Sequence, residues 1–257
     1  MNKNLVFLLS AISFSMFFSS CEEDLPYDDD QYGSNCLVVR SEISDFFVRT
    51  IDYDQLDRVI EVSTNGNGME PERMTVTYNN NIAFADFFRG GQLLFSIEAP
   101  LNAAGNVIES TTTDAAGTEV AYQSFTYNSS DQIVSIAGRN AILNTEDSLV
   151  VLWTNDNATR FKRQVVPDVI CDYYSGKEST FNVGLGNVIL LYMQVDGDIA
   201  QIYSKELLKT YDLNGVTVGQ PIHFSYDFDS DDKVRKIFSS SGSGNPQQTT
   251  TIDYECE

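Results

Sequence analysis

The sequence predicts an all-β fold: an antiparallel meander of repeated hairpins, curled into a barrel-like or clam-shaped sheet with few or no helices. Short apolar or alternating segments recur along the 257-residue chain, and turn residues separate them. Many turns follow an aromatic residue and an Asp or Asn, and β-branched residues follow the turn. Consecutive hairpins make antiparallel neighbours, and the sheet must close or fold over on itself because open edges promote aggregation.

The clearest hairpin covers residues 123–136, with the sequence QSFTYNSSDQIVSI. One strand ends at Tyr127, a polar four-residue turn follows, and a second apolar run begins at Ile133. Residues 51–62 predict a second hairpin that turns at 55–57. Further copies, including the alternating segment before Asn79 and a last half copy, are predicted at residues 74–81, 101–108, 152–159, 192–199, 211–216, 226–234 and 252–254.

Three other segments carry their own expectations. Apolar residues alternate with polar ones from Ile222 to Phe228, which predicts a strand with its apolar face in a core and His223 facing solvent. Residues 188–193 form a continuous apolar run, as expected for a strand that is covered on both faces. Residues 204–209 predict one short helical turn.

The first twenty residues predict a lipoprotein signal peptide. Lys3 supplies a positive charge, and the apolar run over residues 5–18 is shorter than the roughly 20 residues that span a bilayer. The sequence Phe-Ser-Ser-Cys at 18–21 resembles the lipobox of bacterial lipoproteins, with Phe18 where Leu is more usual. The resemblance implies cleavage before Cys21 and lipidation of Cys21, which would hold the membrane through acyl chains. Ordinary secretion with an incidental cysteine is the alternative.

Residues 21–35 predict an acidic flexible tether to a single antiparallel β domain at 36–257. Glu22, Glu23 and Asp24 directly follow the predicted lipidation site. This cluster resembles the surface-export signal of Bacteroidetes lipoproteins and implies a position on the outer face of the outer membrane. The alternative is a solvated linker on a lipoprotein that faces the periplasm.

The hairpin grammar of aromatic, Asp, turn and β-branched residue resembles the YD-repeat units of RHS-type proteins. Together with the lipobox and the acidic leader, it resembles Bacteroidetes surface lipoproteins with a porin-like antiparallel barrel. The resemblance covers residues 36–257 and implies a fold rather than an activity. Several copies depart from the pattern because they lack the turn glycine, as at 128–131. The strands show no apolar lipid-facing band, so the implied barrel is not expected to lie in the bilayer.

Three cysteines remain for the folded domain: Cys36, Cys171 and Cys256. Export permits a disulfide, and three cysteines allow one bridge. The first and last strands of a closed meander are neighbours, which favours a Cys36–Cys256 pair. Three unpaired, buried thiols are the alternative.

A weak calcium candidate lies in the segment that begins at Asp227, where Asp229 and Asp231 follow at alternate positions. However, the sixth position is Asp232 where a calcium loop needs Gly, and the twelfth is Phe238 where it needs Glu. Aspartate is also favoured in turns, so a hairpin turn is the main interpretation. We therefore predict no metal and no cofactor.

Composition restricts the functions further. The net charge of −21, from 37 acidic and 16 basic side chains, repels phosphate backbones and excludes nucleic acid as a partner. His223 is the sole histidine, and no Gly-x-Ser-x-Gly elbow occurs. The 13 Tyr and 16 Phe either form core and cross-strand pairs or stack on sugars, and Trp153 is expected in the core.

The sequence thus predicts a non-catalytic cell-surface lipoprotein that binds a glycan or another envelope protein. A structural or accessory subunit of an outer-membrane complex is the alternative, and a hydrolase is the third possibility.

Overall fold

The computed structural model describes residues 36–43, 47–142, 144–163, 168–179, 204–213, 221–241 and 248–256. The predicted signal peptide, Cys21, the acidic cluster, the rest of the tether and the predicted strand at 188–193 lie outside the described residues.

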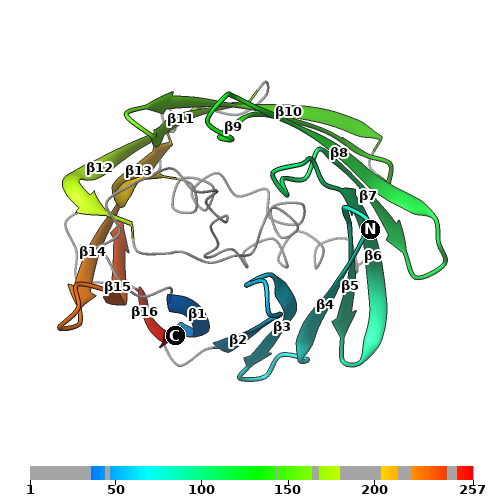
Figure 1. The fold of residues 1–257 in the computed structure, drawn as a ribbon, viewed down its shortest axis with the longest axis horizontal. Helices are drawn as coiled ribbons and strands as arrows, with labels where there is room; N and C mark the ends of the chain where they lie inside the picture. The colour runs from blue at the N-terminus through cyan, green and yellow to red at the C-terminus, as the bar shows by residue number, and fades with distance from the viewer. Residues whose placement is uncertain are drawn as a thin grey trace.

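The described residues form 16 β-strands that close into one antiparallel barrel, which confirms the all-β prediction (Figure 1). The sheet is a closed ring rather than an open clam. The strands are β1 (Cys36–Ile43), β2 (Phe47–Tyr53), β3 (Val59–Gly66), β4 (Glu72–Asn79), β5 (Ile82–Arg89), β6 (Gln92–Pro100), β7 (Glu109–Asp114), β8 (Glu119–Tyr127), β9 (Ile133–Asn140), β10 (Thr145–Thr154), β11 (Asn157–Arg163), β12 (Val169–Glu178), β13 (Glu206–Leu213), β14 (Ile222–Phe228), β15 (Val234–Ser241) and β16 (Gln248–Cys256).

The barrel closes where β1 and β16, far apart in sequence, lie side by side in blue and red (Figure 1). Their register runs from Cys36 opposite Cys256 to Ile43 opposite Thr250. We call this junction the seam, and the end of the barrel where β1 begins and β16 ends the seam end. Because the strands alternate in direction, every even-numbered strand ends and every odd-numbered strand begins at the seam end.

The inner face of the barrel carries the core. Side chains alternate across each strand, and one set from around the ring forms a single buried cluster. Its largest fully buried members include Phe161, Ile133 and Ile252. Trp153 packs against this cluster, as predicted.

On β14 the predicted alternation holds for part of the strand. Phe224 and Tyr226 pack against the core, and His223 faces solvent as expected. Phe228, however, is 39% exposed. The β14–β15 register shifts between Asp227 and Phe228, and the Phe228 ring lies 6.5 Å from the Tyr226 ring between centroids.

The outer face is mostly polar. Arg73 and Thr77 are exposed on β4, and Ser225 and Asp227 are exposed with His223 on β14. Among the residues that the structure describes, none forms a helix with the length and apolar character to cross a membrane.

The helical turn predicted at 204–209 is wrong, because β13 begins at Glu206. Leu207 and Leu208 are both 1% exposed, and β13 pairs with β12. Burial of two leucines and ladder pairing therefore override the local helical preference of the sequence.

Candidate functional site

Five turns share one local structure, in which an Asp or Asn side chain organises the backbone. In each, the Oδ1 atom accepts hydrogen bonds from the N–H groups two and four residues later, at 2.9–3.0 Å. The third residue after it has a positive φ of 54–80°. These turns begin at Asp54, Asn102, Asp114, Asn128 and Asp229. The need for a side-chain acceptor and then a left-handed residue explains the recurring Asp/Asn and Gly of the sequence.

Two of these aspartates have lowered pKa values. Burial opposes ionisation of Asp54, but hydrogen bonds from the Arg58 side chain and from the backbone of Arg58 and Leu56 outweigh it and lower its pKa. The pKa of Asp229 is lowered in the same way, against burial, by the backbone of Lys233 and Asp231 and by Arg235. Both carboxylates are thus held ionised by the turns that they organise.

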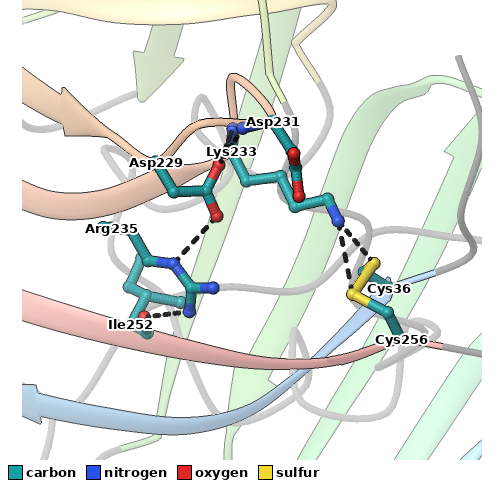
Figure 2. Close-up of a disulfide and its surroundings, with 7 residues drawn as sticks. All are labelled: Cys36, Asp229, Asp231, Lys233, Arg235, Ile252 and Cys256. Carbon is teal, nitrogen blue, oxygen red and sulfur yellow. Dashed lines mark hydrogen bonds and ion pairs between the residues drawn. A yellow bond between two sulfur atoms is a disulfide. The ribbon is translucent and has the colours of Figure 1, made fainter.

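In the weak calcium candidate, the carboxylate oxygens of Asp229 already accept hydrogen bonds from within the hairpin turn (Figure 2). Oδ1 of Asp229 accepts from the backbone of Asp231 and Lys233, and Oδ2 accepts from Arg235 Nε at 3.0 Å. Asp227 precedes this turn on β14, where it lies opposite Lys236. Within the described ranges, no three His, Cys, Asp or Glu side chains gather as a metal site would require.

Substitutions at Asp229 distinguish a calcium ligand from a residue that stabilises the turn. We expect Asp229→Ala to lower the free energy of unfolding by about 1–2 kcal/mol, because two backbone N–H groups and Arg235 lose their acceptor. Asp229→Asn should lose less than half as much, since an amide oxygen organises the equivalent turn at Asn128. Urea unfolding with and without calcium measures both effects. A calcium-dependent midpoint in wild type that Asp229→Asn abolishes would contradict the turn interpretation.

Aromatic side chains link most hairpins to the strand before them. Six aromatic donors on even-numbered strands each bond to a backbone carbonyl oxygen N-terminal to their own strand, at 2.6–3.1 Å: Tyr53 to Val38, Tyr78 to Val59, Tyr127 to Val107, Trp153 to Ile133, Tyr173 to Ala158 and Tyr226 to Leu208. We call the six donors the aromatic belt. Each acceptor residue is 0–1% exposed, so its carbonyl has little access to water.

The belt explains the recurrence of tyrosine at turn entries. Burial raises the pKa values of Tyr53, Tyr127, Tyr173 and Tyr226 well above the ordinary value of 10. Their rings pack against the core cluster. These tyrosines are therefore committed to the barrel wall rather than presented as a platform for sugars.

A disulfide joins Cys36 to Cys256 across the seam, with a Cα–Cα distance of 4.1 Å (Figure 2). This is the pair that a closed meander favoured. Cys171 lies outside the disulfide and is buried in the core. The Lys233 ammonium, from the Asp229 turn, lies 2.8 Å from Cys36 Sγ and 3.3 Å from Cys256 Sγ (Figure 2).

Every described Asp and Glu is at least partly exposed. Asp54 and Asp229 have lowered pKa values, whereas a general acid needs a raised pKa.

An apolar patch with two cations lies on the outer face over β10, β11 and β12. Leu152 lies opposite Arg160, which lies opposite Ile170, and Val150 lies opposite Lys162. The three apolar side chains are 39–41% exposed. Arg160 Nε donates to Asp168 at 2.7 Å. We call these residues, Val150, Leu152, Arg160, Lys162 and Ile170, the outer patch.

The outer patch was not predicted from the sequence. Val150 and Leu152 belong to the continuous apolar run 149–152, whose inner members Leu149 and Val151 are buried. A continuous run does not show which residues face outward.

Among solved structures, the chain is similar to a porin-like protein from Bacteroides uniformis ATCC 8492. The two are 17% identical and superpose with a TM-score of 0.60, and the match covers 86% of this chain and 98% of that one. A second porin-like protein, from Bacteroides vulgatus ATCC 8482, is 8% identical over 86% of this chain and 99% of its own, with a TM-score of 0.32. No family model and no curated protein matches this chain. The first likeness shows a shared fold, and the second is too distant to support an argument.

Proposed function

We propose that this protein is a non-catalytic lipoprotein of the outer membrane whose barrel binds another envelope protein through the outer patch. The observation that carries the proposal is the position of Val150, Leu152 and Ile170 together on neighbouring strands of a face that is mostly polar. Adjacent exposed apolar side chains with a polar rim are typical of protein interfaces, whereas single ones are ordinary.

The chemistry of the patch suggests the character of its partner. Arginine is enriched in protein interfaces, and the buried centre of an interface is more apolar than its rim. Arg160 stands between Leu152 and Ile170, so its apolar stem extends the apolar surface while its head stays paired with Asp168. Lys162 adds an exposed cation in a chain of net charge −21. A partner with an apolar centre and a carboxylate at its edge would fit.

A glycan ligand receives less support. Sugar stacking requires exposed aromatic faces, and the aromatic belt uses its tyrosines in internal hydrogen bonds. The large exposed hydrophobic side chains of the described residues are mostly aliphatic, with Phe84 and Phe228 as the aromatic members.

The proposed location rests on the sequence before the barrel. Acylation of Cys21 would anchor the chain, and Glu22, Glu23 and Asp24 would direct it to the outer face. The polar outer face of the barrel supports this arrangement because it suits a domain that is held beside a membrane and not within it.

Crosslinking in intact cells tests partner and location together. With a membrane-impermeant amine crosslinker, we expect wild type to give one discrete crosslinked envelope protein. Leu152→Asp combined with Ile170→Asp should reduce the yield at least about tenfold, because a buried carboxylate opposes docking. Glu22→Ala, Glu23→Ala and Asp24→Ala together should abolish crosslinking while the protein remains membrane-bound.

The matched control is Ser225→Asp, which adds a carboxylate at an exposed position on β14, away from the outer patch. It should crosslink as wild type does. Equal yields from the patch variant and wild type would remove the patch from the proposal. Equal labelling of the leader variant and wild type would remove the surface location.

A further inference from the structure

The two cysteines of the seam disulfide differ in exposure and in their distance from Lys233. Cys36 is 7% exposed, whereas Cys256 is exposed near the end of β16. The Lys233 ammonium lies closer to the buried sulfur, at 2.8 Å against 3.3 Å. The bond thus joins an exposed cysteine to a buried one, and the Lys233 ammonium lies beside both sulfurs (Figure 2).

Both of these features favour thiol–disulfide exchange. A thiolate attacks an accessible sulfur, and the other sulfur leaves faster when its negative charge is stabilised. An ammonium group at hydrogen-bond distance supplies that stabilisation. Lys233 is held in place because its backbone N–H donates to Asp229 Oδ1 at 2.9 Å, and the Asp229 turn is fixed in turn by Arg235.

We propose that the seam disulfide is a site of reversible exchange with an external thiol, in which Cys256 is attacked and Cys36 is the leaving group. A bond forms between the incoming sulfur and Cys256 Sγ while the Cys36–Cys256 bond breaks. Its electron pair leaves on Cys36 Sγ as a thiolate beside the Lys233 ammonium. The incoming thiol is oxidised to a mixed disulfide and Cys36 is reduced.

The reverse step restores the Cys36–Cys256 disulfide. Cys36 and Cys256 remain opposite each other because the β1–β16 register extends to Ile43 and Thr250. The Cys36 thiolate therefore stays within reach of the mixed disulfide and can attack Cys256 Sγ, releasing the external thiolate.

The test uses the oxidised full chain carrying Cys21→Ser and a small uncharged thiol, 2-mercaptoethanol. After brief exposure the reaction is quenched with acid, released thiols are alkylated, and peptides are identified by mass spectrometry. We expect the mercaptoethanol adduct on Cys256 and the alkyl group on Cys36. Lys233→Met should slow adduct formation by about three- to tenfold, because the leaving thiolate loses its cation.

Two further variants keep the result interpretable. Lys233→Arg preserves the charge and should exchange at close to the wild-type rate. Lys236→Met removes an exposed lysine from the outer face of β15 and should have no effect. An adduct on Cys36, or on both cysteines equally, in the wild-type chain would overturn the proposal. Equal exchange rates for Lys233→Met and Lys236→Met would overturn the role of Lys233.

Discussion

Replacing both seam cysteines, Cys36→Ala with Cys256→Ala, should lower the free energy of unfolding by about 3–5 kcal/mol, the largest stability effect we expect. The bridge joins residues 220 positions apart. For a loop of that length, chain-entropy arguments place the constraint on the unfolded chain at about 5 kcal/mol. Urea unfolding followed by tyrosine and tryptophan fluorescence measures the change.

Chemical reduction of the wild-type chain provides the control for this experiment, since it opens the bridge without changing a side chain. The reduced wild type and the double variant should unfold at similar urea concentrations. A reduced protein that is as stable as the oxidised one would show that closure of the barrel depends on the β1–β16 ladder alone.

The second large effect is expected at Tyr173. Its hydroxyl donates to the Ala158 carbonyl at 2.6 Å and accepts from Ser204 at 2.8 Å, and Ser204 in turn accepts from the Ala158 N–H. Tyr173→Phe removes the hydroxyl, so the Ala158 carbonyl loses its donor and the buried Ser204 hydroxyl loses its acceptor. We expect a loss of about 2–3 kcal/mol in the free energy of unfolding, more than for Tyr53→Phe, whose hydroxyl has one bond in the belt.

Tyr122→Phe is the matched control, because the Tyr122 hydroxyl donates to Glu109 on the outer face. It should change stability by less than about 0.5 kcal/mol. A Tyr173→Phe variant as stable as the Tyr122→Phe variant would contradict the structural role of the belt.

The belt tyrosines Tyr53, Tyr127, Tyr173 and Tyr226 predict how the free energy of unfolding changes in alkali. Their folded pKa values are raised above the unfolded value of 10, so the stability that they contribute is fully present below that pH. It is lost progressively as the pH rises above 10, because only the unfolded chain ionises readily.

The turns of the fold could be predicted because their determinants are local. An Asx oxygen and its two N–H donors lie within four residues, so Asn128 or Asp229 marks a turn without knowledge of the rest of the chain. The expectation of closure favoured a Cys36–Cys256 pair but left three unpaired thiols as the alternative. The number of strands and the choice of barrel over clam did not follow, because they depend on how all hairpins pack together.

The features of the site that were missed are long-range. Lys233 and Cys36 are 197 residues apart, and belt partners such as Tyr127 and Val107 are 20 apart on different hairpins. The recurrence of tyrosine at turn entries could be seen in the sequence. The acceptors could not be predicted, because they are backbone carbonyl oxygens, which every residue carries. Phe228 was expected on the core face but is 39% exposed at the end of β14, and a period-2 pattern does not show how far the cover of a strand extends.

Closure of the ring gives the first and the last strand of the chain a pairing partner. In an open repeat array, the first and last units each lack a neighbour and need polar caps. Here β16 pairs with β1, so every hairpin has a neighbour on both sides and no unit is terminal. The strands at the two ends of the chain therefore protect each other, and neither presents the unpaired edge on which a second chain could add.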